Sequence, residues 1–258
     1  MKNLLIVAML AGFLSPIANA DELPFWVGER KIQGENNLRP IRDYKNEDIY
    51  GITRGVAIVE TSYGKGFCTG ARVGKNLFLT NFHCDAAISC DKVQFRMGYE
   101  TGIEKEDQQV FKCVKRLATA EEFDYVLYEV KQIGELPNTV EEYPIMTLEA
   151  AELTNEMALV IAGHPSGRRK EIDLSENCKL TSVETQVMDK RQTLTHMCDT
   201  EGGNSGSPVL DAATGNIIAI HWGGIRAKYN LAVPMSLVLK DIESKVSSVV
   251  YSKLNIAD

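Results

Sequence analysis

The 258-residue sequence predicts an all-β fold, a barrel or a sandwich, followed by one C-terminal helix. Short runs rich in β-branched and aromatic residues alternate with clusters of Gly, Asn, Asp and Pro, which favour turns. No sequence repeat and no low-complexity tract interrupts this pattern. The strand candidates are 56–59, 77–80, 93–97, 110–117, 125–130, 157–162, 192–197, 217–222 and 231–233.

The strand candidates differ in how clearly they are marked. Run 77–80 follows the turn sequence Gly74-Lys75-Asn76, and run 125–130 (YVLYEV) is strongly apolar. The end of the chain has a helical period instead, because its apolar residues recur in three- and four-residue steps. We expect Ser236, two residues after Pro234, to cap this helix, and its apolar face to pack on the barrel. That face comprises Leu239, Ile242, Val246, Val249 and Val250.

The N-terminus has the pattern of an export signal. Lys2 supplies a positive charge, Leu4 to Leu14 is an apolar run, and Ala18-Asn19-Ala20 is a small-x-small cleavage site. We therefore expect residues 1–20 to be a signal peptide and the protein to be secreted or periplasmic, with no membrane contact after the signal is removed. Residues 21–54 are polar and predict an N-terminal arm or a propeptide, and residues 55–258 form the folded domain.

Composition narrows the function further. The formal net charge of −7 gives no reason to expect nucleic-acid binding. All six cysteines follow the signal segment, and an even number in an exported chain favours disulfides, for which fifteen pairings exist. Metal binding is the alternative, because His83-Cys84 and His196-x-Cys198 combine two ligand types. The paired spacings typical of structural zinc are absent from the sequence, so we expect no metal and no cofactor.

One short segment, CDTEGGNSGSPVL, places Gly202, Gly203 and Gly206 around Ser205. Such a bend either is an ordinary surface turn or presents a nucleophile next to backbone N–H groups. A serine nucleophile needs a base and a carboxylate that orients the base. His83 directly follows a strand candidate, and Asp124 begins the apolar run YVLYEV, where it is placed to be buried. Weaker candidates for the carboxylate, in polar surroundings, are Asp85 and Asp107.

The motifs TNFHC, FDYVLYEV and GGNSGSPV, in this order, resemble those of the chymotrypsin-like serine peptidases. GGNSGSPV followed by IAIHWGG is closer still to the bacterial glutamyl endopeptidases. The resemblance covers residues 55–239 and implies two six-stranded antiparallel β-barrels with a cleft between them. It implies that Ser205 is the nucleophile, His83 the base and Asp124 the orienting carboxylate, with the amides of Gly203 and Ser205 as the oxyanion hole. It also implies that the substrates are proteins or peptides, and we expect the chain to be a monomer.

The resemblance has consequences for the cysteines and for activation. It implies the bridges Cys68–Cys84 and Cys178–Cys198, which leaves Cys90 and Cys113 as the third pair. Trypsin and chymotrypsin have an aspartate before the nucleophile that binds a new N-terminus, but this chain has Asn204. Activation by that ion pair is therefore not expected, and the cut of any propeptide stays open. Candidate cuts are Lys31-Ile32 and Arg54-Gly55.

The substrate preference has two interpretations. Asp199 lies six residues before Ser205, where trypsin has the aspartate at the floor of its pocket, and this favours cleavage after Arg or Lys. Thr200 and His221 resemble the residues that bind an acidic side chain in glutamyl endopeptidases, and both can donate hydrogen bonds to a carboxylate. We favour cleavage after Glu. The residues expected to bind substrate are Asp199, Thr200, His221, Trp222 and Gly223.

Overall fold

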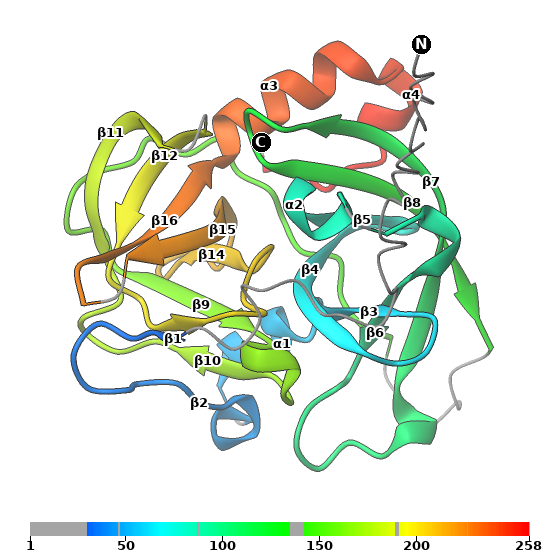
Figure 1. Cartoon of the computed structure of the whole chain (residues 1–258), viewed down its shortest axis with the longest axis horizontal. Coiled ribbons are helices and arrows are strands. Elements are labelled where there is room, and N and C mark those ends of the chain that lie inside the picture. Colours follow the sequence, from blue (N-terminus) through cyan, green and yellow to red (C-terminus); the bar gives the residue numbers. More distant parts are fainter. Residues whose placement is uncertain are drawn as a thin grey trace, which may run out of the picture.

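The computed structural model describes residues 30–257 except 46, 87, 135–141, 189–190 and 226. The predicted signal peptide and its cleavage site lie outside the described residues. Two β-structures lie side by side, and helix α3 runs across one end of both (Figure 1). Within the described residues, no helix is long and apolar enough to cross a membrane.

The first half forms a closed, six-stranded antiparallel barrel, as the resemblance implied. Long strands β7 and β8 pair from Val110–Ile133 to Ala120–Tyr125 and form one wall. Aromatic side chains, among them Phe78, Phe95 and Phe111, fill the interior. In barrel order, the strands are β3 (Val56–Thr61), β4 (Gly66–Gly74), β5 (Leu77–Thr80), β8 (Tyr125–Ile133), β7 (Gln109–Ala120) and β6 (Val93–Met97).

The second half is an eight-stranded sheet. An antiparallel bridge between Ala158 and Lys179 brings β11 back beside the start of β9, and this contact completes a ring of six strands. Strands β10 and β2 extend the sheet beyond that ring. In sheet order, the strands are β11 (Leu180–Met188), β12 (Arg191–His196), β16 (Tyr229–Pro234), β15 (Ile217–Ile225), β14 (Pro208–Asp211), β9 (Leu159–Gly163), β10 (Glu171–Asp173) and β2 (Arg39–Pro40).

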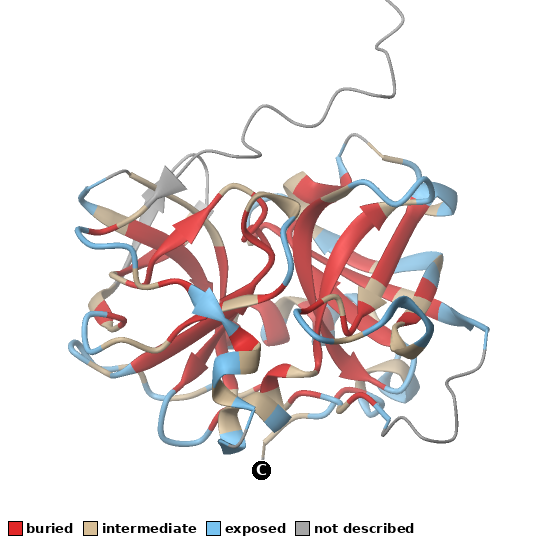
Figure 2. Ribbon diagram, turned by 90° about the horizontal axis from the view of Figure 1, so that it is seen from below, coloured by how far each residue is buried: buried red, intermediate tan, exposed pale blue. Residues whose placement is uncertain are grey.

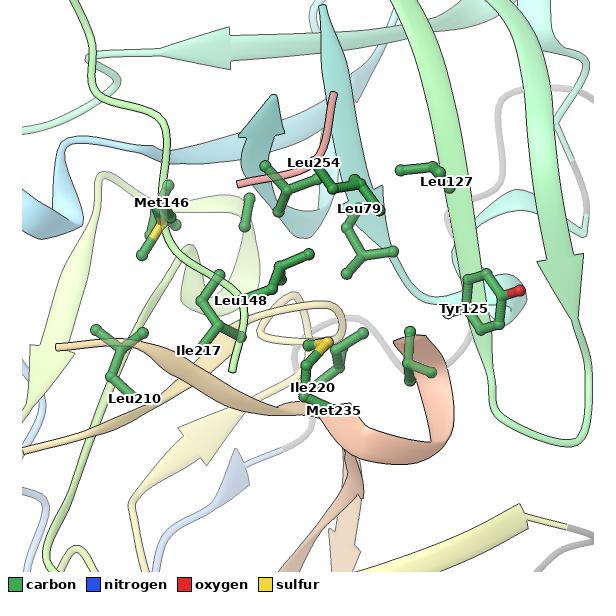
Figure 3. Close-up of a cluster of buried hydrophobic side chains, with 14 of the residues drawn as sticks. Leu79, Tyr125, Leu127, Met146, Leu148, Leu210, Ile217, Ile220, Met235 and Leu254 are labelled. Carbon is green, nitrogen blue, oxygen red and sulfur yellow. The ribbon is translucent and has the colours of Figure 1, made fainter. Parts of the chain in front are cut away.

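A shared apolar core joins the two halves. Figure 2 shows the buried strands of each half and the exposed outer loops, and Figure 3 shows side chains that meet between them. Leu79 and Leu127 come from the first barrel, Leu210 and Ile220 from the second, and Met235 from α3, and all are buried. Burial of apolar surface contributes about 25 cal/mol per Å², so this contact fixes the halves relative to each other.

The C-terminal helix differs from its prediction. Helix α3 (Met235–Lys245) starts directly after Pro234, so Ser236 lies inside the first turn and is not the cap. Val246 is extended, with φ −111° and ψ 161°, and ends the helix. A separate short helix, α4 (Ser248–Tyr251), follows, and Val249 on it is 65% exposed. The predicted apolar face is therefore interrupted at Val246, and of its residues only Leu239 and Ile242 are buried in the core.

Residues before position 55 are built into the fold. Strand β1 (Arg30–Lys31) pairs with β13 (Thr200–Glu201), and β2 pairs with β10. Ile41, on a short 3-10 helix (Ile41–Tyr44), is fully buried. Helix α1 (Asp48–Thr53) leads into the first barrel. The remaining short elements are helix α2 (Phe82–Asp85) and the 3-10 turns Cys90–Lys92, Lys105–Asp107 and Pro165–Gly167.

Candidate active site

His83 and Asp124 meet because β5 and β8 are neighbours. His83 lies on α2 directly after β5, and Asp124 lies directly before β8. His83 Nδ1 is 2.7 Å from Asp124 Oδ2, and the backbone N of His83 donates to Asp124 Oδ1 at 3.0 Å. The carboxylate is fully buried, whereas the His83 side chain is 16% exposed. A carboxylate at Nδ1 favours a proton there, which leaves Nε2 as the acceptor.

The turn that presents Asp124 is held firmly. Asp124 has φ +42°, a left-handed conformation that is uncommon for residues other than glycine. The carbonyl oxygen of Asp124 accepts from Asn81 Nδ2 at 2.8 Å, and the backbone N of Asp124 donates to the Glu121 carbonyl at 3.2 Å. The two alternative aspartates have other contacts, through the carboxylate of Asp85 and through the backbone of Asp107. Asp85 is buried against Arg116 and the Tyr128 hydroxyl, and the carbonyl of Asp107 accepts from Tyr143.

Ser205 lies on the loop between β13 and β14, in contact with the first barrel. Its carbonyl accepts from the backbone N of Thr69 on β4 at 2.8 Å. The same carbonyl oxygen is 3.9 Å from Sγ of Cys84, the residue that follows His83. The serine loop, the imidazole and its carboxylate therefore gather where the two halves meet.

The backbone amides of the serine loop fall into two groups. Asn204 N donates to the Glu201 carbonyl at 3.0 Å, and Gly206 N and Ser207 N also donate to backbone carbonyls. Among the residues that the structure describes, the amides of Gly203 and Ser205 donate to no acceptor. Two such donors, separated by one residue, can bind an oxyanion.

Gly203 could not be replaced without disturbing this loop. It has φ +97°, and a Cβ there would lie 2.6 Å from the carbonyl oxygen of His164 and 2.9 Å from the amide of Ser166. Both distances are far below an ordinary van der Waals contact. A glycine is required both by its φ and by the close approach of loop 164–168.

The six cysteines lie in three pairs at disulfide distance, and none is free. The pair Cys68–Cys84 connects β4 to α2 beside His83. In the pair Cys178–Cys198, Cys198 is the residue directly before Asp199. The third pair is Cys90–Cys113. Cys68, His83 and Cys84 are near enough together for metal ligation, but the two sulfurs are bonded to each other and offer no thiolate.

The carboxylate of Asp199 is occupied by the N-terminal segment of residues 33–37. Gln33 N donates to Oδ1 at 2.6 Å, and Asn37 donates to Oδ2 through its backbone N at 2.8 Å and its Nδ2 at 3.1 Å. Asp199 is fully buried. Three hydrogen bonds saturate most of its acceptor capacity. The geometry is that of an anchor for residues 33–37.

Thr200 and His221 are in a different situation from Asp199. Thr200 is fully buried, and within the described part of the chain its hydroxyl has no hydrogen-bond partner. The backbone of His221 is bonded to the serine loop, because its N donates to the Ser207 carbonyl and its O accepts from Gly206 N. Asn230 Nδ2 donates to the Cys198 carbonyl at 2.6 Å and so connects this strand pair to the segment carrying Thr200.

His221 is kept neutral by its surroundings. Burial lowers its pKa well below 6.5, electrostatic interactions with the rings of His196 and His83 lower it further, and a hydrogen bond with the Leu231 backbone raises it by less. His221 Nδ1 is 3.2 Å from Nε2 of His196, which is also buried and whose pKa burial lowers to about 3. The sequence marks His196 as a possible metal ligand, and no motif indicates its contact with His221.

Trp222 and Gly223 follow His221 on β15. The indole Nε1 of Trp222 donates to Thr193 Oγ1 at 3.2 Å, which turns this ring toward β12. A Cβ added at Gly223 would meet no atom within 4 Å, so there is open space beside that residue.

This chain is similar in sequence to known peptidases. A family model of a trypsin-like peptidase domain matches residues 64–220. A glutamyl endopeptidase of Staphylococcus aureus (strain MW2) is 25% identical over 227 residues, with 79% of this chain and 65% of that protein covered. The homologue from strain N315 is 26% identical over 183 residues, with 68% and 50% covered. The chain thus spans less than two thirds of the length of the relatives it matches, 65% for the first of them.

Solved structures with the same fold are more distant in sequence. An inactive mutant form of Rv3671c from M. tuberculosis superposes with a TM-score of 0.55 at 14% identity, covering 83% of this chain and 97% of that one. Deg5 superposes with a TM-score of 0.58 at 15% identity, covering 80% and 98%. At such identities the likeness concerns the fold alone.

Proposed function

Because the chain belongs to the family of trypsin-like peptidase domains, we propose that it is an exported serine endopeptidase that acts through Ser205, His83 and Asp124. The observation that carries the proposal is the 2.7 Å contact between His83 Nδ1 and the buried Asp124 carboxylate. This contact lies beside a glycine-rich serine loop with two available amides. The substrates are proteins or peptides, and no metal or organic cofactor takes part.

The proposed reaction passes through an acyl-enzyme. His83 Nε2 takes the proton of the Ser205 hydroxyl as this oxygen attacks the peptide carbonyl, and then gives it to the leaving amine. Asp124 keeps the other imidazole proton at Nδ1 and stabilises the imidazolium. The amides of Gly203 and Ser205 bind the oxyanion, and such a donor contributes about 3 kcal/mol to transition-state stabilisation. Water then releases the acyl group by the same steps in reverse.

We propose cleavage after Glu. The trypsin-like alternative needs the Asp199 carboxylate at the floor of the pocket, but this group is buried and accepts three hydrogen bonds from Gln33 and Asn37. Thr200 has a hydroxyl to donate, and the neutral His221 has one N–H. Two neutral donors can bind a carboxylate without leaving a buried charge when the pocket is empty. The glutamyl endopeptidases among the relatives support the same preference.

The proposal is tested first for catalysis. A fluorophosphonate should label the wild-type protein, and Ser205→Ala should lose both the label and peptide hydrolysis. A binding protein of the same fold that lacks catalysis would show neither label nor turnover in the wild type. Thr214→Ala is a matched control, because Thr214 lies on an exposed turn after β14.

The substrate preference needs a second experiment. Two peptides that differ only in Glu or Lys before the scissile bond are compared with wild type and His221→Ala. We expect faster cleavage of the Glu peptide, and a selective loss of that preference in the variant. Faster cleavage of the Lys peptide by the wild type would overturn the Glu assignment and leave the peptidase assignment standing.

A further inference from the structure

Loop 164–168 of the second half lies against the serine loop. Ser166 N donates to the Gly202 carbonyl at 2.5 Å. A trans peptide directs its C=O and its N–H in opposite directions. The Gly202 carbonyl and the Gly203 amide belong to one peptide, so this bond turns the Gly203 N–H away from loop 164–168.

The next peptide is held from the first barrel. Thr69 Oγ1 donates to the Gly203 carbonyl at 2.8 Å and accepts from the backbone N of His164 at 2.9 Å. Thr69 is fully buried on β4, and its backbone N also binds the Ser205 carbonyl. One hydroxyl therefore connects the first barrel, loop 164–168 and the serine loop.

Ser166 needs support to make its contact. It has φ +52° and ψ +29°, a left-handed conformation that non-glycine residues hold only when their surroundings enforce it. Its Oγ donates to Glu201 Oε2 at 3.0 Å, and Arg168 Nη1 donates to the same oxygen at 2.6 Å. The Glu201 side chain is 1% exposed, so the two contacts lie in a site that excludes most water.

We propose that Thr69 and Glu201 are positioning residues for the oxyanion hole. Thr69 fixes the Gly203 carbonyl, and Glu201 fixes Ser166, whose amide fixes the Gly202 carbonyl. Both peptides flanking Gly203 are thereby held in the orientation that presents its N–H to a substrate. This inference rests on the proposed peptidase function, and neither residue needs to touch the substrate.

The test uses the full mature protein and separates positioning from folding. Thr69→Val keeps the shape and removes the hydroxyl, and Thr69→Ser restores it. For Thr69→Val we expect a loss of kcat of about tenfold to hundredfold, below the loss of a whole oxyanion donor, with KM changed by less than about threefold. A peptide aldehyde, which forms a tetrahedral adduct with Ser205, should lose affinity by a similar factor. Thr69→Ser should recover most of both.

A second variant and a control complete the design. Glu201→Gln keeps the size of the side chain and weakens its contacts to Ser166 and Arg168, so we expect a smaller loss with the same signature. Arg169→Ala is the control, because Arg169 directly follows loop 164–168 but donates to the Glu100 carbonyl. It should keep the wild-type kcat. If Thr69→Val does not fold, Glu201→Gln decides the question.

Several results would overturn the inference. They are an unchanged kcat in both variants, a loss that appears only in KM, a kcat loss without weaker aldehyde binding, or a Thr69→Ser protein as impaired as Thr69→Val. The substrate affinity measured in a Ser205→Ala background should not change when Thr69→Val is added. Absence of turnover and of fluorophosphonate labelling in the wild type would instead refute the proposed function, so the two failures are distinguishable.

Discussion

Replacing Asp199 with asparagine separates the two roles that this carboxylate could have. As an anchor it holds residues 33–37, and as a pocket floor it would bind a basic substrate side chain. Its Oδ1 accepts one hydrogen bond and its Oδ2 accepts two, all from Gln33 and Asn37. An amide has one acceptor oxygen and one NH₂ group. In either orientation the NH₂ faces at least one backbone N–H, so at least one bond is lost and a donor is left unpaired.

The size of the effect follows from these contacts. A hydrogen bond to a charged group contributes about 1.5–3 kcal/mol, and a buried donor without a partner costs about 1–3 kcal/mol. We expect Asp199→Asn to lower the free energy of unfolding by about 2–4 kcal/mol. For a domain of this size, 1 kcal/mol corresponds to about 2–4 °C, so Tm should fall by roughly 5–15 °C. Asn37→Ala keeps the backbone bond to Asp199 but removes both Nδ2 contacts, one to Asp199 and one to the exposed Glu35 carbonyl, and should cost about 1 kcal/mol.

The assay combines thermal unfolding with the paired Glu and Lys peptides. An anchoring role predicts the drop in Tm together with an unchanged order of preference between the two peptides below the new Tm. A variant with the wild-type Tm and a selective loss of cleavage after Lys would refute the reasoning. In that case Asp199 faces the substrate, and its contacts with residues 33–37 are not those of the active enzyme.

Three further predictions concern stability. Burial lowers the pKa of His164 and of His196 to about 3, so below about pH 6.5 these histidines take up protons in the unfolded chain but not in the folded protein. The free energy of unfolding, measured with urea, should therefore fall as the pH falls, by about 1.4 kcal/mol per pH unit for each histidine. A flat profile between about pH 6.5 and 5 would contradict this. Replacing both Cys90 and Cys113 with serine removes a disulfide between residues 23 positions apart. The free energy of unfolding, measured by chemical denaturation, should fall by about 3 kcal/mol while kcat is retained. A lower kcat would show that this bridge affects the active site. Lys170→Met should destabilise the fold by about 3 kcal/mol, because it leaves the buried Glu100 carboxylate without the Lys170 ammonium. An unchanged stability in calorimetry would indicate that the charge of Lys170 is dispensable.

Local sequence patterns were sufficient for much of the first barrel. The apolar run at 125–130 is strand β8, and the acidic residue directly before it is buried, as its position suggested. Strand β4 (GFCTGARVG) escaped prediction although all but its first residue are buried. Its glycines and a buried arginine hide the apolar pattern. A Cβ at Gly70 would lie 3.0 Å from the Phe95 ring, closer than an ordinary contact, and this reason for a glycine is visible only in the packed barrel.

The residues that shape the candidate pocket depend on contacts distant in sequence. Asp199 accepts a hydrogen bond from Gln33, 166 residues away, and His196 on β12 meets His221 on β15 across the intervening strand β16. No local period or motif encodes such pairs, because they depend on how β12, β15 and β16 align. The order of the motifs therefore located the triad candidates, whereas it left the role of Asp199 ambiguous.

The candidate cuts of a propeptide can be weighed by what each would disconnect. A cut at Arg54-Gly55 would break the chain between the barrel and two segments that bind the second half. Residues 33–37 bind the Asp199 carboxylate, and the Thr53 carbonyl accepts from the buried Lys170 at 3.0 Å. A cut at Lys31-Ile32 removes the strand that pairs with β13 beside Thr200. Trypsin-like activation needs a new N-terminus because an aspartate before the nucleophile requires an ion pair. Asn204 at that position offers no carboxylate for such an ion pair, and the serine loop is held from β4 and from loop 164–168. We infer that residues 32–54 stay attached in the active protein.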